Sequence, residues 1–481
     1  MRVVRAIPLL AFLLLAAAPR AAYAHAHLAR SAPMAGARIN VAPHAIQLWF
    51  SEAPEVSLTT ISLTNASGAA LSLASVSGIP DTAVAVVAMI HGELAPGDYT
   101  VTWRTVAADD GHPSSGTFSF TVIGGAVTRA AGSSSSNGLA RAAPLAAQSA
   151  SPPAAGLDVE SPTYVAVRWL SFMGLVLLLG VVAFRILVMP RVGLSANSAF
   201  AQREAHDTLS AAIIPQLANL GLFAGFITIV AAIGRLLAEQ AVMAASMSMG
   251  LAAIVYQTAW GGAWLLQVGV AIAACVGFAL ARVRFNIGWM IAGIAALVLA
   301  TTPALSGHAA GMPAFRILAI ATDAVHVMAA GAWLGSLSAL VLVALPVSMR
   351  AATRDSATGL MADMVHAFSP IALVSASIVV LTGITSAWLR LGSISALWRS
   401  SYGVVLLVKL ALVGGVFGAG AFNWLRMRVA LGHAASVDSG SAGAVTGVRA
   451  RFQQSGTFEL IFGVLVIAAT AVLVAMPTPV H

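Results

Sequence analysis

The chain has 481 residues, of which 59% are hydrophobic and only 9% are charged, and its mean hydropathy is +0.89. Soluble proteins carry about 25% charged residues, so this composition excludes an ordinary soluble protein, and the high hydrophobicity excludes a disordered chain. The formal net charge of +8 comes from arginines that are spread along the chain rather than clustered on a soluble module, which excludes nucleic-acid binding.

The first 24 residues have the three parts of a secretory signal peptide. Arg2 and Arg5 form a basic start, residues 6–18 form a short apolar run, and Ala22-Tyr23-Ala24 matches the small-residue cleavage pattern. A retained membrane anchor is the alternative, but the apolar run is short for a span. Cleavage after Ala24 would make His25 the mature N-terminus.

Residues 25–123 have the pattern of a small exported all-β domain. Segments 99–103 and 118–122 alternate apolar and polar side chains, which is typical of half-buried strands. Further candidate strands at 45–50, 57–64, 69–75 and 82–90 are separated by turn residues. Six or seven short strands predict a Greek-key sandwich or barrel of the Ig-like or cupredoxin-like kind, and segment 94–99 resembles a tyrosine corner.

The remainder of the chain predicts a flexible linker at 124–160 and an all-α membrane domain at 161–481. The linker is rich in Ala, Gly, Ser and Pro and has no periodic apolar face. Eight apolar stretches after it are long enough to cross a bilayer. The expected spans are 164–188, 209–235, 253–281, 286–305, 317–345, 368–389, 402–425 and 457–476.

The arginines support one orientation of these spans. If the β domain is exported, ten arginines fall in cytoplasmic loops and four in outer loops, in agreement with the positive-inside rule. The β domain and the C-terminus then both face outward. The inner arginines are Arg191, Arg203, Arg282, Arg284, Arg350, Arg354, Arg426, Arg428, Arg449 and Arg451, and the outer ones are Arg235, Arg316, Arg390 and Arg399.

Candidate metal ligands lie at the start of the β domain and in one of its turns. The α-amine and imidazole of His25 can chelate one ion as a histidine brace, and nitrogen ligands suit Cu(II). His27 offers a competing mode. Asp110 and His112, in the turn Asp109-Asp110-Gly111-His112, would point to the same side of an extended segment. Each motif alone is more often an accident of cleavage or an ordinary turn.

Three segments of this region closely resemble the copper resistance protein CopC family. They are HAHLARSAPMAGARI, IQLWFSE and LAPGDYTVTWRTVAADDGHPSSGTFSFTV, in the family's order over about 100 residues. The resemblance implies a periplasmic copper-binding β-sandwich whose Cu(II) ligands are His25, Asp110 and His112. Some members also hold Cu(I) in a Met-rich stretch, but this domain has only Met34 and Met89, so a Cu(II) module alone is expected.

The membrane half resembles the CopD family, the membrane partner of CopC, across most of 160–476. The matching segments are PALSGHAA, DAVHVMAAGAWLGSL, FSPIALVSASIVVLTGI and YGVVLLVKLALV. The resemblance implies a role in copper uptake across the bacterial inner membrane.

Ionisable residues inside spans are costly and are candidates for function. Asp323 and His326 share one face of the fifth span, with Met328 deeper, and His308 and Met312 precede that span. Such a cluster of Met, His and Asp could accept copper, with Met and His favouring Cu(I). The structural alternative is an Asp–His hydrogen bond that locks helices together.

Two buried charges and one group of methionines complete the candidates. Lys409, the only lysine, is expected to pair with Asp323, while Glu459 is either an exit ligand or an ordinary interfacial residue. The methionines lie in the expected outer loop after the second span, where thioethers could gather around Cu(I) or simply fill apolar space. They are Met243, Met247 and Met249.

The sequence therefore predicts a copper-binding and copper-transporting protein of the bacterial plasma membrane, not an enzyme, with copper import as the expected direction. The ligands are copper ions, Cu(II) in the β domain and Cu(I) in the membrane domain, and a periplasmic copper carrier or a reductase is an expected partner. No Walker A motif is present. The alternatives are a b-type haem protein that uses His308 and His326, a membrane-anchored copper sensor or scavenger without transport, and a brace-containing oxidative enzyme.

Overall fold

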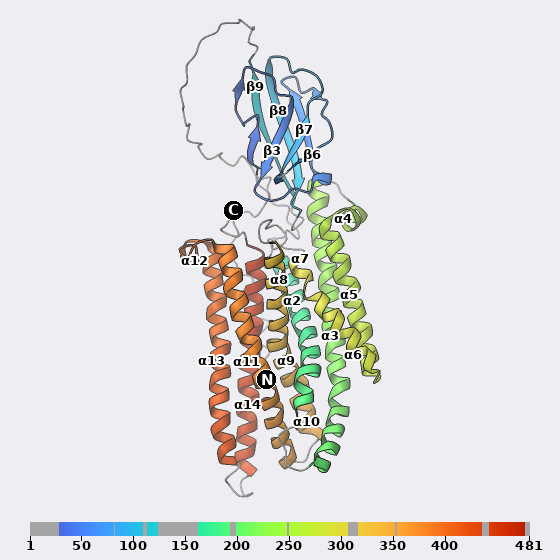
Figure 1. Cartoon of the computed structure of the whole chain (residues 1–481), viewed down its shortest axis with the longest axis vertical. Coiled ribbons are helices and arrows are strands. Elements are labelled where there is room, and N and C mark those ends of the chain that lie inside the picture. Colours follow the sequence, from blue (N-terminus) through green and yellow to red (C-terminus); the bar gives the residue numbers. More distant parts are fainter. Residues whose placement is uncertain are drawn as a thin grey trace. The chain divides into compact units, whose positions relative to one another are not determined.

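The computed structural model of the chain describes residues 28–80, 82–108, 113–123, 162–192, 199–247, 250–305, 316–351, 354–434 and 442–476. These residues form two compact units, a β unit and a helical unit (Figure 1). The predicted signal peptide at 1–24 and linker at 124–160 lie outside the described residues.

The β unit consists of two sheets, which confirms the predicted sandwich. One sheet has the strand order β1-β3-β7-β6, and the other has the order β2-β9-β8-β4-β5, with β2 parallel to β9. The strands are β1 (Leu28–Ala32), β2 (Arg38–Ile39), β3 (Ala45–Phe50), β4 (Thr60–Asn65), β5 (Ala70–Leu71), β6 (Ser77–Ile79), β7 (Thr82–Met89), β8 (Gly97–Val106) and β9 (Pro113–Val122). A 3-10 turn, Val56–Leu58, occupies the start of the segment predicted as a strand at 57–64.

Alternating side chains build the core of the sandwich. Ile46, Leu48 and Phe50 of β3 are buried, as are Val101 and Trp103 of β8, while the residues between them are more exposed. Each such side chain contributes about 1.5–3 kcal/mol by leaving water. The two inner faces therefore hold the sheets together, as expected from the period of two in the sequence.

The predicted tyrosine corner is confirmed. The Tyr99 hydroxyl donates a hydrogen bond to the Ala95 carbonyl at 2.6 Å, and the ring stacks on Phe120 with centroids 5.5 Å apart. Because the hydroxyl bonds to the chain just upstream, it closes the turn that leads into β8.

Among the described residues, the helical unit has eight helical segments that are long and apolar enough to cross a bilayer, as predicted. Its helices are α2 (Pro162–Ala183), α3 (Ala199–Met247), α4 (Leu251–Gln257), α5 (Ala259–Arg282), α6 (Asn286–Leu299), α7 (Thr302–Leu305), α8 (Arg316–Ala330), α9 (Ser336–Ala339), α10 (Leu345–Ala351), α11 (Arg354–Leu391), α12 (Ala396–Arg399), α13 (Ser401–Ala434) and α14 (Ala442–Val474). Short turns join some of them into longer segments: the π-helical turns η2 (Phe184–Val188), η4 (Gly331–Gly335) and η5 (Leu340–Ala344), and the 3-10 turn η3 (Met189–Arg191).

The third span begins later than predicted. Helix α4 ends at Gln257, and Thr258 starts the span by accepting a hydrogen bond from the Gly261 amide at 2.9 Å. A threonine side chain in this position satisfies one of the free amides of a new helix. The residues from 253 to 257 therefore belong to a separate short helix.

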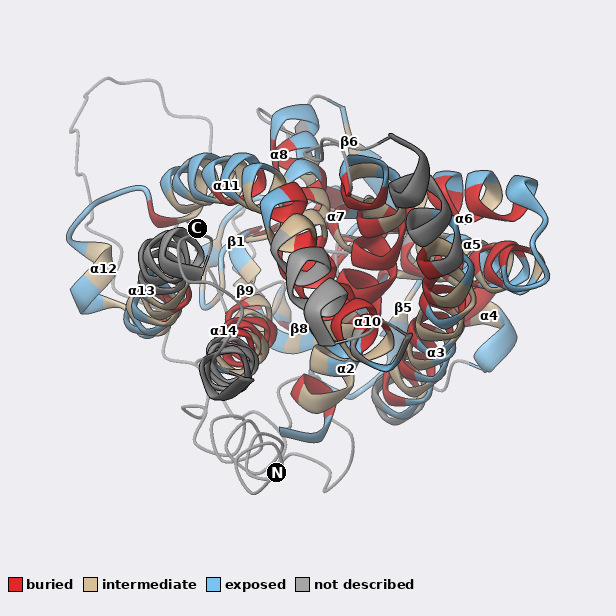
Figure 2. Cartoon of the chain, turned by 90° about the horizontal axis from the view of Figure 1, so that it is seen from below, coloured by how far each residue is buried: buried red, intermediate tan, exposed pale blue. Residues whose placement is uncertain are grey.

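The first and fifth spans cross closely at the centre of the helical unit. A Cβ built on Gly180 of α2 would lie 2.0 Å from the Gly335 carbonyl carbon, and one on Gly335 would lie 2.1 Å from the Val176 oxygen. Ser336 donates across the same contact to the Gly180 carbonyl at 3.2 Å. Figure 2 shows buried residues gathered around α2 and the neighbouring helices, whereas much of α11 and α13 is exposed. The paired glycines let two backbones meet.

Replacing Gly335 with alanine should destabilise the protein by about 1–3 kcal/mol, because the added methyl group would overlap the backbone of α2. Gly269→Ala in α5 is the matched control, since a Cβ there meets nothing within 4 Å. It should leave stability unchanged or raise it slightly through helix propensity. Thermal unfolding of both variants in one detergent makes the comparison, and equal melting temperatures would refute the close crossing.

Candidate functional site

One end of the β-sandwich brings together the chain segments that flank the predicted copper ligands. Leu28, the first residue of β1, lies opposite Phe50, the last residue of β3. The Phe50 ring packs edge-on against Trp103 of β8, with centroids 5.1 Å apart. The start of β1 is therefore at the same end of the sandwich as the end of β8.

The segment after β3 completes this end. The Ala108 amide donates to the Ala53 carbonyl at 2.8 Å, the Glu55 amide donates to the Val106 carbonyl at 2.7 Å, and Val106 pairs with Pro113 at the start of β9. Asp110 and His112 lie between β8 and β9, and His25 and His27 directly precede β1. All four residues lie outside the described residues, but the described residues that flank them, Leu28, Ala108 and Pro113, converge here.

Glu52 is a further carboxylate at this end that the sequence analysis did not select. It lies between Phe50 and Ala53, in the segment that crosses to the second sheet, and one of its carboxylate oxygens is buried. A carboxylate oxygen is a suitable ligand for a divalent metal. The sequence contained one indication of this role: Glu52 lies two residues after the predicted strand at 45–50 and ends the IQLWFSE segment that resembles CopC.

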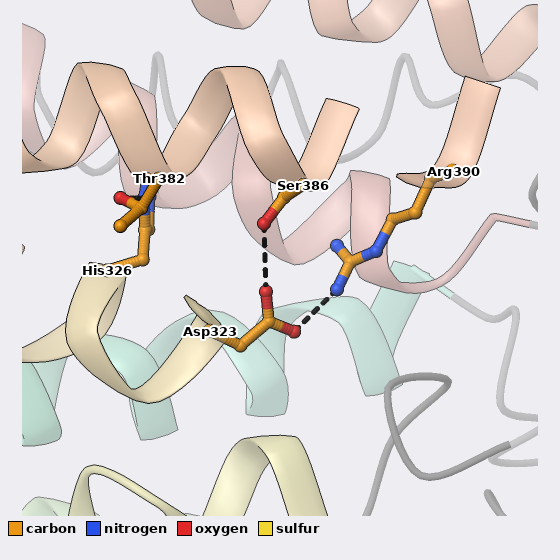
Figure 3. A network of polar contacts seen from close by, with 5 residues as sticks. All are labelled: Asp323, His326, Thr382, Ser386 and Arg390. Carbon is orange, nitrogen blue, oxygen red and sulfur yellow. Dashed lines mark hydrogen bonds and ion pairs between the residues drawn. The ribbon is translucent and has the colours of Figure 1, made fainter. Parts of the chain in front are cut away.

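In the helical unit, Asp323 of α8 contacts α11 rather than Lys409. Its Oδ2 accepts from the Arg390 guanidinium at 2.5 Å, and its Oδ1 accepts from the Ser386 hydroxyl at 3.1 Å (Figure 3). The prediction that Lys409 pairs with Asp323 is therefore wrong: among the described residues, no hydrogen bond or ion pair joins them. Lys409 lies on α13 within electrostatic range of both Asp323 and Arg390.

His326 contacts the same helix one turn away. Its Nδ1 lies 2.9 Å from the Thr382 hydroxyl oxygen, and this hydroxyl also lies 2.7 Å from the Ile378 carbonyl. The alternative of an Asp323–His326 hydrogen bond is also wrong, because each side chain makes its own contact with α11 (Figure 3). Together the contacts tie the fifth span to the sixth.

The partners on α11 follow a pattern that the sequence analysis missed. Thr382, Ser386 and Arg390 are spaced by four residues and form one polar stripe along α11. This stripe meets the Asp323–His326 face, whose residues are spaced by three. The spacing was visible in the sequence, although nothing local indicated which helix the stripe would contact.

The other predicted residues of the membrane path are only partly described. His308 and Met312 lie outside the described residues. Met328 is half-buried and packs against the main core of the helical unit. Glu459 is buried in α14, near the start of the eighth span. Asp323 lies near the start of the fifth span, which crosses in the opposite direction in the predicted topology. The structure therefore brings Asp323 and His326, but not Glu459, to one polar region.

Two of the three predicted outer-loop methionines lie in a helix rather than in a loop. Met243 lies inside α3, and Met247 is the last residue of that helix, while Met249 lies outside the described residues. The helix continues because residues 236–247 are mostly Ala, Leu, Met, Glu and Gln, which are good helix formers, and the next glycine is Gly250. The next described helix, α4, begins at Leu251.

A second polar network joins the first three spans. The Arg235 guanidinium donates to Gln267 at 3.3 Å, and Gln267 donates to the Ser171 hydroxyl at 3.4 Å. The Trp264 indole donates to the Ala232 carbonyl at 2.8 Å. These contacts satisfy polar groups within apolar helices and link α2, α3 and α5.

Three family models match the chain. The model described as the CopC domain matches residues 28–123. Copper resistance protein D-like, N-terminal domain matches residues 158–316, and Copper resistance protein D matches residues 362–473. The first match covers the β-sandwich, and the other two cover most of the helical unit.

Curated relatives give the same division. The Copper transport protein CutJ of Bacillus subtilis (strain 168) is 25% identical over 424 residues, which are 85% of this chain and 69% of the relative. Copper resistance protein D of Pseudomonas syringae pv. tomato is 27% identical over 279 residues, 55% of this chain and 82% of the relative. Protein YobA of Escherichia coli (strain K12) is 32% identical over 100 residues, 21% of this chain and 80% of the relative.

Proposed function

Because the chain belongs to the CopC and copper resistance protein D families, we propose that it captures copper with its β-sandwich and imports it across the bacterial plasma membrane through its helical unit. The sandwich binds Cu(II) through His25, Asp110 and His112. The helical unit carries Cu(I). The β-sandwich and the C-terminus face the extracytoplasmic side.

The observation that carries the proposal is the convergence at one end of the sandwich. The described residues nearest in sequence to His25, Asp110 and His112 are Leu28, Ala108 and Pro113, and all three lie at the end where Phe50 packs on Trp103. An amine, two imidazoles and a carboxylate in one place form a nitrogen-rich set that suits Cu(II). Glu52, at the same end, adds a further oxygen donor.

The contacts around His326 support Cu(I) in the helical unit. The Asp323 carboxylate is engaged by Arg390 and Ser386, so its charge is already balanced, and Lys409 adds a positive charge nearby. A monovalent ion experiences less repulsion there than a divalent ion. Copper therefore passes from a Cu(II) site to a Cu(I) path, and a reductase or a reducing copper carrier supplies the electron.

Replacing His326 with alanine should lower copper uptake into proteoliposomes about 10-fold or more, because the fifth span loses its imidazole ligand. His366→Ala in α11 is the control, since His366 is exposed near the other end of the span and should leave uptake within about 2-fold. Uptake is measured for each oxidation state, with Cu(I) maintained by a reductant. The proposal fails if the wild-type protein is no faster than empty liposomes in both states.

A further inference from the structure

We propose that Thr382 is a positioning residue that fixes the tautomer of His326, so that Nδ1 carries the proton and Nε2 carries the lone pair that binds copper. The role in copper binding rests on the proposed function. The tautomer itself follows from the hydrogen bonds in the helical unit and does not depend on any metal.

The geometry places the Thr382 hydroxyl within hydrogen-bond distance of three possible partners. Thr382 Oγ lies 2.7 Å from the Ile378 carbonyl of its own helix and 2.9 Å from His326 Nδ1 on α8. The Val379 carbonyl is farther, at 3.2 Å. The side chains of His326 and Thr382 face one another across the two helices (Figure 3).

The Thr382 hydroxyl has a single proton, and the carbonyl can only accept. If the hydroxyl proton pointed to His326 Nδ1, the lone pairs of Thr382 Oγ and of the Ile378 carbonyl oxygen would face each other at 2.7 Å without a proton between them. The proton therefore goes to Ile378, and Oγ accepts from an Nδ1–H group. Ser377 and Thr385 of the same helix also donate to carbonyls four residues earlier, at 2.9 and 3.1 Å.

A neutral imidazole has one N–H, so an Nδ1–H ring has its lone pair on Nε2. Metal-binding histidines commonly donate their other N–H to a fixed acceptor, which sets the tautomer and the ring orientation. A carboxylate often has this role, but Asp323, which lies three residues before His326 on α8, is engaged by Arg390 and Ser386. The hydroxyl of Thr382 takes that place here, and it adds no negative charge to the ring.

Nitrogen-15 NMR of histidine-labelled, copper-free protein in lipid nanodiscs tests the tautomer directly. The His326 signals are identified by their loss in His326→Gln. In the wild-type protein we expect a protonated Nδ1 and an unprotonated Nε2. A protonated Nε2 in the wild-type protein would overturn the inference, and this outcome requires no variant of Thr382 to fold.

Copper uptake then tests the consequence. Thr382→Val should lower uptake about 10-fold and allow the second tautomer, while Thr382→Ser, which restores the hydroxyl, should stay within about 2-fold of wild type. Thr385→Val is the matched control, because Thr385 bonds to its own helix in the same way without a contact to His326. Equal uptake by Thr382→Val and Thr385→Val would overturn the positioning role. Absence of wild-type uptake would instead refute the proposed function and leave the NMR result intact.

Discussion

Replacing His112 with alanine should weaken Cu(II) binding by the full-length protein about 100-fold or more. The substitution removes one of the nitrogen ligands while the amine and imidazole of His25 stay in place. Loss of a group that only supports a metal ligand typically costs 10- to 100-fold in affinity, so loss of a ligand should cost at least as much. Competition with a Cu(II) chelator, using protein in nanodiscs, measures the affinity.

His91→Ala is the matched control for this experiment. His91 is an exposed histidine of the same sandwich that follows β7, and its amide donates to the Ser72 carbonyl, just after β5. This variant should bind Cu(II) as tightly as the wild-type protein. Equal affinities for His112→Ala and His91→Ala would contradict the assignment of His112. Asp110→Ala should also weaken Cu(II) binding, and the loss of affinity should be smaller than in His112→Ala if Glu52 supplies an oxygen ligand in place of Asp110.

Replacing Arg390 with methionine should destabilise the helical unit by about 3 kcal/mol. The Asp323 carboxylate would keep only the Ser386 hydroxyl as a partner, and breaking a partly buried ion pair on one side leaves an uncompensated charge. Both side chains are largely shielded, with 22% and 24% of their surface exposed, so solvent offers little compensation. Thermal unfolding in detergent measures the loss.

The double variant Arg390→Met with Asp323→Asn distinguishes charge balance from simple packing. It removes both charges, so it should regain most of the stability lost in Arg390→Met alone, as expected for coupled sites. Arg399→Met, at an exposed arginine in α12, is the control and should change stability by less than about 0.5 kcal/mol. A double variant that is less stable than Arg390→Met would show that the ion pair is not what stabilises this contact.

The spans and the longer strands were predictable because their signals are local. Eight apolar stretches each satisfy their own backbone hydrogen bonds, so length and composition suffice to find them. The alternation in β3, β7, β8 and β9 reports burial of one face in the same way. Strands β1, β2 and β6 were not predicted, because two to five residues carry too little pattern and only their partners define them.

The partners of the charged residues within the spans were not predictable from local pattern. Asp323 and Arg390 are 67 positions apart, and Lys409 was an equally reasonable partner by charge alone. Which cation pairs with Asp323 depends on which helix packs against α8 and on the position of the basic residue along that helix. The polar stripe at Thr382, Ser386 and Arg390 makes α11 the better match, since three polar groups at helical spacing can satisfy both Asp323 and His326.

For the β-sandwich, motif and structure contribute different parts of the site. The motif supplies the residue types of the ligands, but His25 and Asp110 are 85 positions apart, and no local pattern brings them together. The strand register shows that the described residues nearest to each of them, Leu28 and Ala108, lie at the same end of the sandwich. Glu52 became a candidate only through that register.

Copper capture by the mature N-terminus is tested most directly by one added residue. A variant that is processed to leave a single alanine before His25 keeps every side chain but moves the α-amine away from the His25 imidazole. Electron paramagnetic resonance of the Cu(II)-loaded, full-length protein should then lose the signal of the amine nitrogen, and the affinity should fall about 100-fold. An unchanged spectrum with unchanged affinity would contradict a copper site that begins at His25.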